Sequence, residues 1–158
     1  MGYKVFISHS TRDRGIVISL ANLLKDFGVE VIVAEWYLTP GARIDKKVFT
    51  QIRNSDCVVA LLTRNGIRSN WVNQEIGYSF QENKPIIPLV EKGTDAKDLA
   101  ALQGREYIEY DPNQPDQALK KLSTHIKSLK LKKEERQRAL LVLGGLLAFL
   151  LLLSGGEK

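Results

Sequence analysis

Short apolar runs alternate with helical patterns along residues 3–127, and this alternation limits the possible folds more than any other feature of the sequence. Five runs rich in β-branched and aromatic residues predict strands, the last of them weak and short: Tyr3–Ser8, Val29–Ala34, Cys57–Leu62, Ile86–Val90 and Tyr107–Tyr110. Between them, apolar residues recur at helical spacing, and a last helix is expected at about residues 114–127. Strands that alternate with helices predict an α/β fold, a parallel sheet covered on both faces and joined by right-handed crossovers.

One stretch, Ser69–Glu75, carries the residues best suited to chemistry. Trp71 and Glu75 are four residues apart, so on a helix their side chains share a face, an aromatic ring one turn from a carboxylate. Spacing alone favours ordinary packing, with Trp71 half-buried and Glu75 in water. However, ligands of parallel sheets bind beyond the carboxyl ends of the strands. There the loop entering this helix is expected to meet two others, Ser8–Asp13 and Glu35–Gly41.

Several common site types have little support in the sequence. The sequence has one cysteine, Cys57, so an internal disulfide is excluded. Cys57 lies in an apolar run that is typical of a buried strand. His9 and His125 stand far apart without ligand spacing, so no metal site is expected. The sequence contains neither a G-x-G-x-x-G nor a Walker motif, so a glycine-rich nucleotide loop is not supported.

The C-terminal region predicts a membrane anchor. Ala139–Leu153 contains no polar side chain, and with residues 154–156 the run reaches about 27 Å, close to the ~30 Å hydrocarbon core of a bilayer. Residues 127–158 hold seven Lys/Arg against three Asp/Glu, most of the net charge of +5, which favours a membrane surface over nucleic acid. The positive-inside rule then leaves the globular part cytoplasmic. The alternative is a buried or oligomerisation helix in a soluble assembly.

The N-terminus agrees with a cytoplasmic globular part. Residues 1–8 carry neither a secretory signal nor a myristoylation motif, so we expect the chain to begin inside the cell.

Four segments in order carry a resemblance to a known family: Val5–Ser10 with Asp13, Glu35–Gly41, Asn54–Leu62 and Ser69–Glu75. Together they resemble the TIR (Toll/interleukin receptor) domain in its bacterial and archaeal form, over residues 3–127. The resemblance implies a flavodoxin-like sheet of five parallel strands, self-association of TIR domains and, in many members, hydrolysis or cyclisation of NAD+. The implied division is a TIR domain at 1–127, a basic juxtamembrane linker at 128–138 and a transmembrane helix at 139–156.

The resemblance also implies roles by position. Glu75 falls on the catalytic glutamate, Trp36 and Trp71 fall where the family places aromatics near the substrate, and Ser8, His9 and Ser10 line the first loop. Ala34 departs from the pattern, since the family often has Asp there, four residues before the loop leucine.

The resulting prediction is a membrane-anchored NAD+ hydrolase or cyclase, active on self-assembly, in prokaryotic antiviral defence or signalling. NAD+ is its substrate, with no resident cofactor and no nucleic-acid partner. Loss of neutral nicotinamide builds positive charge at the anomeric carbon, so a single carboxylate suffices. Two alternatives stay open: a non-catalytic TIR scaffold that recruits other TIR proteins to the membrane, and a nucleoside deoxyribosyltransferase-like enzyme.

Overall fold

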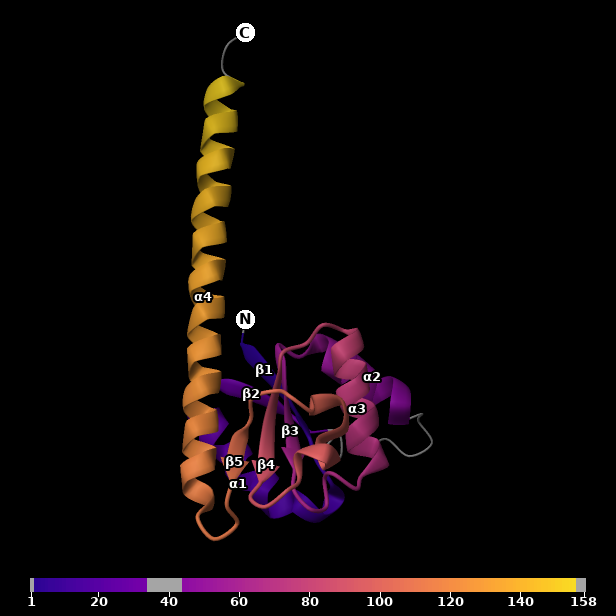
Figure 1. Cartoon of the computed structure of the whole chain (residues 1–158). Coiled ribbons are helices and arrows are strands. Elements are labelled where there is room, and N and C mark those ends of the chain that lie inside the picture. Colours follow the sequence, from indigo (N-terminus) through magenta and orange to yellow (C-terminus); the bar gives the residue numbers. More distant parts are fainter. Residues whose placement is uncertain (1, 34–43, 156–158) are drawn as a thin grey trace. The chain divides into compact units, whose positions relative to one another are not determined.

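Five parallel strands form one sheet at the centre of the chain's first unit (Figure 1). The computed structural model describes residues 2–33 and 44–155. The strands are β1 (Tyr3–Ser8), β2 (Val29–Ile32), β3 (Cys57–Leu62), β4 (Ile86–Glu91) and β5 (Ile108–Tyr110). Their spatial order is β2-β1-β3-β4-β5, and every neighbouring pair is parallel. The predicted α/β fold with five parallel strands is confirmed.

Helices connect successive strands, as the alternation of patterns predicts. The connecting helices are η1 (Thr11–Asp13), α1 (Arg14–Asp26), α2 (Ile44–Asn54), α3 (Asn70–Gln81) and η3 (Ala96–Leu102). One more helix, α4 (Pro115–Ser154), follows β5. The short 3-10 helix η3 was not predicted from the sequence. The predicted loop Glu35–Gly41 and Ala34 lie outside the described residues.

The strand order reverses between β1 and β3, and this reversal locates the candidate site. From β1 the chain passes through α1 to β2 on one side, then returns through α2 to β3 on the other side of β1. The chain therefore leaves β1 through α1 toward one edge of the sheet and leaves β3 through α3 toward the other edge. In such sheets this reversal is the topological switch point, and ligands bind beyond the carboxyl ends of the two strands beside it. Ser8 is the last residue of β1 and lies opposite Ala60 of β3, so it lies at this switch point.

Helices α2 and α3 cover the same face of the sheet (Figure 1). Buried side chains of α2 pack against β1, β2 and β3 in a cluster of Phe6, Ile32, Val48, Ile52 and Val58. Those of α3 pack against β3, β4 and η3 in a second cluster of Ala60, Leu62, Val72, Ile76, Val90, Leu99 and Leu102. Because all six residues of β3 are buried, both of its faces must be covered. Helix α1 adds buried apolar side chains of its own at Val17, Leu20, Ala21 and Leu24.

The last helix differs from the prediction, which ended it near Lys127. It continues without a break to Ser154, because residues 129–138 are Leu, Lys, Glu, Arg and Gln, all strong helix formers. The chain divides into two compact units, residues 1–124 and 125–158, so α4 begins in one and forms the other.

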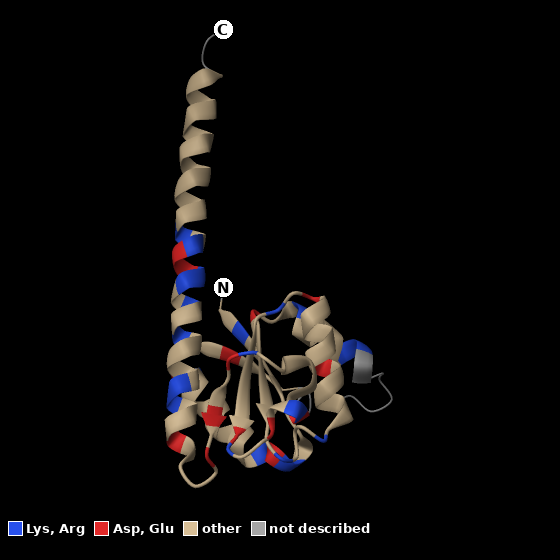
Figure 2. Cartoon of the chain, viewed as in Figure 1, with Lys and Arg blue, Asp and Glu red and all other residues tan. Residues whose placement is uncertain are grey.

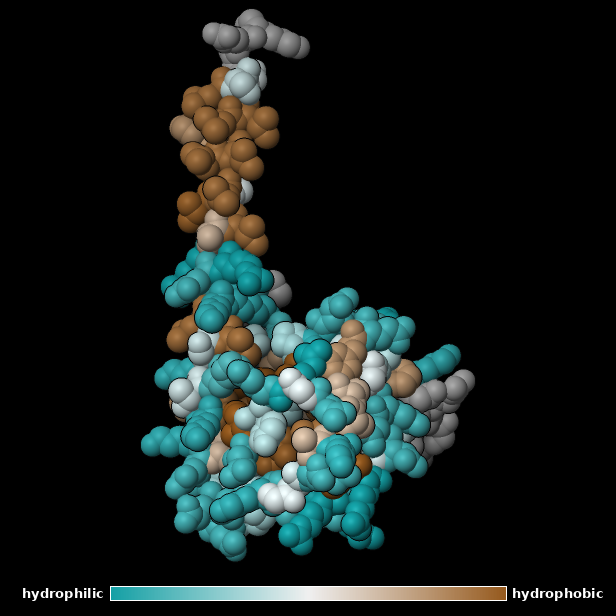
Figure 3. All heavy atoms as spheres, viewed as in Figure 1, coloured by the Kyte–Doolittle hydropathy of each residue, from teal (hydrophilic) through white to brown (hydrophobic). Residues whose placement is uncertain are grey.

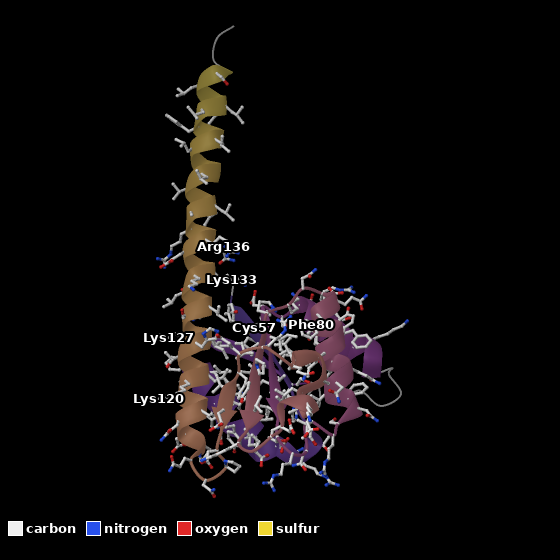
Figure 4. The ribbon with its side chains drawn as sticks, in the orientation of Figure 1. Cys57, Phe80, Lys120, Lys127, Lys133 and Arg136 are labelled. Atoms are coloured by element: carbon white, nitrogen blue, oxygen red, sulfur yellow. The ribbon has the colours of Figure 1, made fainter. Side chains whose placement is uncertain are left out.

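The C-terminal part of α4 is apolar on every side. Its leucines from Leu140 to Leu153 are each at least half exposed, and Figure 3 shows the visible face of this stretch as hydrophobic. A band of Lys and Arg precedes it (Figure 2), with Lys133 and Arg136 labelled in Figure 4. Among the described residues, α4 is the one helix long and apolar enough to cross a membrane.

Candidate active site at the carboxyl edge of the sheet

A serine from β1 and a glutamate from α3 meet at the carboxyl edge of the sheet. The Ser8 hydroxyl donates a hydrogen bond to the Glu75 carboxylate at Oε2. Both side chains are buried, with 0% of Ser8 and 2% of Glu75 exposed to solvent. Because a buried carboxylate is costly unless hydrogen-bonded groups surround it, the hydroxyl stabilises Glu75 and fixes its orientation.

Helix α3 places Glu75 on its buried face. Val72, Glu75, Ile76 and Ser79 are all buried, at the three- and four-residue spacing of one helix face. The Ser79 hydroxyl donates to the main-chain carbonyl of Glu75 at 2.7 Å. At the start of the helix Ser69 is the N-cap, and its hydroxyl accepts from the Val72 amide at 3.3 Å. The sequence left open a solvated Glu75, and the structure excludes it.

Trp71 lies one turn before Glu75 on the same helix, as its spacing predicts. Its side chain is half-buried and packs against the cluster that joins α2 to β1, β2 and β3. Trp71 therefore contributes to the core that holds α3 against α2.

The first loop begins directly after Ser8. His9 is buried, and its Nδ1 lies 3.3 Å from the carbonyl oxygen of Ile7. Ser10 is half-exposed and is the N-cap of η1, where its hydroxyl accepts from the Arg12 amide at 3.4 Å. Both residues thus follow Ser8 directly; His9 contacts the backbone of β1, and Ser10 contacts the backbone of the loop. Trp36, the remaining predicted site residue, lies outside the described residues.

A second buried carboxylate, that of Asp13, follows Ser8 by five residues, and no role was predicted for it from the sequence. Asp13 ends η1 and is 6% exposed. It accepts hydrogen bonds from the Thr63 hydroxyl at 2.6 Å and from the Asn65 amide at 3.1 Å, both in the loop after β3. The sequence does offer one signal for Asp13, which is a carboxylate five residues after the end of a predicted strand.

The lone cysteine is remote from these groups. Cys57 is the first residue of β3 (Figure 4), whereas Thr63 follows its last, about 20 Å along the strand. Burial raises the pKa of the Cys57 thiol to about 12, and the hydrogen bond with Tyr3 opposes this only in part. In residues 2–33 and 44–155 no group of three or more His, Cys, Asp or Glu could hold a metal ion.

Sequence and structure comparisons place the chain among known proteins. A family model described as TIR domain matches residues 5–123. A 2′ cyclic ADP-D-ribose synthase from Acinetobacter baumannii is 28% identical over 132 residues, and one from Bacteroides thetaiotaomicron is 27% identical over 128 residues. These matches cover 80% and 78% of this chain, but only 45% and 42% of the relatives.

Among solved structures, the TIR domain of the Toll-related receptor TRR-2 from Hydra magnipapillata superposes with a TM-score of 0.66 at 20% identity. The superposition covers 79% of this chain and 98% of that one. At this identity the likeness concerns the fold.

Proposed function

This chain belongs to the TIR domain family, and we propose that it is an enzyme that cleaves the bond between nicotinamide and ribose in NAD+. The observation that carries the proposal is the buried Glu75 carboxylate, held by Ser8 at the switch point of the sheet. The two bacterial relatives are synthases of a cyclic ADP-ribose, a product that forms from NAD+ when nicotinamide is lost. This relationship supports NAD+ over other nucleotides as the substrate.

Glu75 has the chemistry that this cleavage needs. Nicotinamide leaves as a neutral molecule, so no acid is required, and positive charge develops at the anomeric carbon of the ribose. A carboxylate fixed beside that carbon stabilises the charge more in the transition state than in the ground state. Attack by water, with loss of a proton, gives ADP-ribose, whereas attack by a hydroxyl of the substrate gives a cyclic ADP-ribose. Glu75 serves both routes.

The other predicted site residues have supporting roles in this proposal. Ser8 orients Glu75, while His9 and Ser10 line the first loop beside it. Trp71 is assigned to the nicotinamide, where stacking of an aromatic ring on the charged pyridinium contributes about 1–2 kcal/mol when water is excluded. Trp36 keeps the same role as a prediction from the family resemblance alone.

The apolar part of α4 anchors the enzyme in a membrane, with the catalytic unit on the cytoplasmic side. The exposed leucines and the preceding band of Lys and Arg support this arrangement. Anchoring concentrates TIR domains in a plane and favours the self-association on which activity depends, in prokaryotic defence or signalling. Carbonate washing of membranes tests the anchor: the full chain should stay in the membrane fraction, and its release would contradict the anchor.

Turnover of NAD+ by the full chain, reconstituted at high density in lipid vesicles, tests the enzymatic proposal. The wild type should release nicotinamide, whereas Glu75→Gln and Glu75→Ala should not. Glu82→Gln is the matched control, because Glu82 caps the end of the same helix and pairs with Arg53 at 3.3 Å on the surface. Chromatography of the products distinguishes ADP-ribose from a cyclic product.

Two outcomes would redirect the proposal. A deoxynucleoside offered in parallel should remain intact, and its cleavage in place of NAD+ would favour the deoxyribosyltransferase alternative. If the clustered wild type released no nicotinamide, the scaffold that recruits other TIR proteins would take its place.

A further inference from the structure

The buried carboxylate of Asp13 joins the loop that follows Ser8 to the loop that leads into α3, the helix of Glu75. We infer that Asp13 is a positioning residue: it holds the loop that follows Ser8 against the loop that leads to Glu75. The inference rests on the proposed function, because it assigns Asp13 a part in the same reaction. It does not require Asp13 to touch the substrate.

The Asp13 carboxylate is the acceptor in both of its side-chain hydrogen bonds. An ionised carboxylate can only accept, so the Thr63 hydroxyl must direct its proton to Oδ2, at 2.6 Å. The oxygen of the same Thr63 hydroxyl then accepts from the main-chain amide of Gly66 at 3.0 Å. The side-chain amide of Asn65 donates to Oδ1 of Asp13 at 3.1 Å. Three groups of the loop after β3 are therefore oriented by one side chain of the loop after β1.

Further hydrogen bonds connect the loop after β3 to the start of α3. The Ser69 amide donates to the Gly66 carbonyl at 3.0 Å, and the Ser69 hydroxyl caps the helix by accepting from Val72. The backbone at Gly66 packs closely against β3 and leaves no room for a side chain, because a Cβ atom there would lie 2.0 Å from the Leu61 carbonyl oxygen. The path from Asp13 to the first turn of α3 is thus continuous and tightly packed.

On the other side, Asp13 is tied to the segment that follows Ser8. The Asp13 amide donates to the Ser10 carbonyl at 2.9 Å, within the turn of η1. A change at Asp13 therefore alters the spacing between Ser8 and Glu75, the two ends of the hydrogen bond that orients the proposed catalytic carboxylate. Displacement of a catalytic group by about 1 Å can lower a rate about 100-fold.

The test compares Asp13→Ala and Asp13→Asn with Asp56→Ala in the full chain in vesicles. Asp56 is a matched control, because it links the same two strands at their opposite ends, where its Oδ2 accepts from the Lys4 amide at 2.7 Å. We expect Asp13→Ala to lower kcat for nicotinamide release about 10- to 100-fold, with KM changed less than about threefold. Asp56→Ala should lower stability while kcat stays unchanged.

Asp13→Asn separates positioning from a direct charge effect. Its carbonyl can still accept from Thr63, and its amide can donate to Asn65 once that carboxamide has turned. A positioning role therefore predicts that Asp13→Asn recovers most of the lost kcat. Equal losses in Asp13→Asn and Asp13→Ala, or full activity in Asp13→Ala, would overturn the inference. If Asp13→Ala does not fold, Asn65→Ala replaces it as the test. This variant removes one of the hydrogen bonds to Asp13, so it should lower kcat by a smaller factor. Full activity of Asn65→Ala would then overturn the inference.

Hydrogen exchange provides a readout that needs no NAD+. Amides of the first two turns of α3 should exchange faster in Asp13→Ala than in Asp56→Ala or the wild type. If the wild type releases no nicotinamide, the proposed function fails, and the exchange alone then decides on the link from Asp13 to α3. Equal exchange in all three proteins would overturn it.

Discussion

Replacing Ser8 by alanine removes the hydrogen bond that orients Glu75 and keeps the backbone of β1 unchanged. Both groups are buried, and the acceptor is a carboxylate, for which a hydrogen bond contributes about 1.5–3 kcal/mol. If this contribution is realised in the transition state, kcat for nicotinamide release falls about 10- to 150-fold, since each 1.36 kcal/mol is a factor of ten. The same loss should lower the free energy of unfolding by about 1.5–3 kcal/mol.

Ser79→Ala is the matched control for Ser8→Ala. Ser79 is the same residue type, is equally buried and also donates to Glu75, but to its main-chain carbonyl rather than its carboxylate. It should therefore change kcat by less than about twofold. Initial rates of nicotinamide release over a range of NAD+ concentrations, with urea unfolding of each variant, measure both effects. Equal kcat values for Ser8→Ala and Ser79→Ala would refute the role given to Ser8.

Two further predictions concern stability and reactivity. Gly66→Ala should destabilise the fold by about 1–3 kcal/mol or more, because the new Cβ meets the Leu61 carbonyl, whereas Gly77→Ala, within α3 and in open space, should stabilise it by about 0.5–1 kcal/mol. Urea unfolding measures both, and equal midpoints would contradict this. Cys57 should resist a thiol reagent at about pH 8, since burial keeps its pKa near 12, and should react once urea unfolds the chain. Rapid labelling of the folded chain would contradict its burial.

The strands were predictable because each is a short apolar run between clear turn signals. Strands β1 and β3 have the predicted bounds, while β2 ends at Ile32, two residues before its predicted end. The continuity of α4 was not predicted, because residues 128–138 are mostly charged and show no apolar helical pattern, although their helix propensity is high.

The meeting of Ser8 and Glu75 was predictable in outline from two general rules. Strand ends of a parallel sheet converge, and a helical period fixes which side chains share a face. The bond between the two side chains was not predictable, because it joins positions 67 apart in the sequence. The same holds for Asp13 and Thr63, which are 50 positions apart. Such contacts depend on the packing of the loops, which leaves no local pattern in the sequence.

Binding and turnover of NAD+ by Glu75→Gln, measured on the same preparation, test the central claim most directly. Glutamine is nearly isosteric and can still accept from Ser8, so the variant should bind NAD+ by calorimetry with a Kd within about threefold of the wild type. Its nicotinamide release should fall at least ~100-fold, because the carboxylate that stabilises the developing charge is gone. Release within about twofold of the wild-type rate would contradict a catalytic role for Glu75.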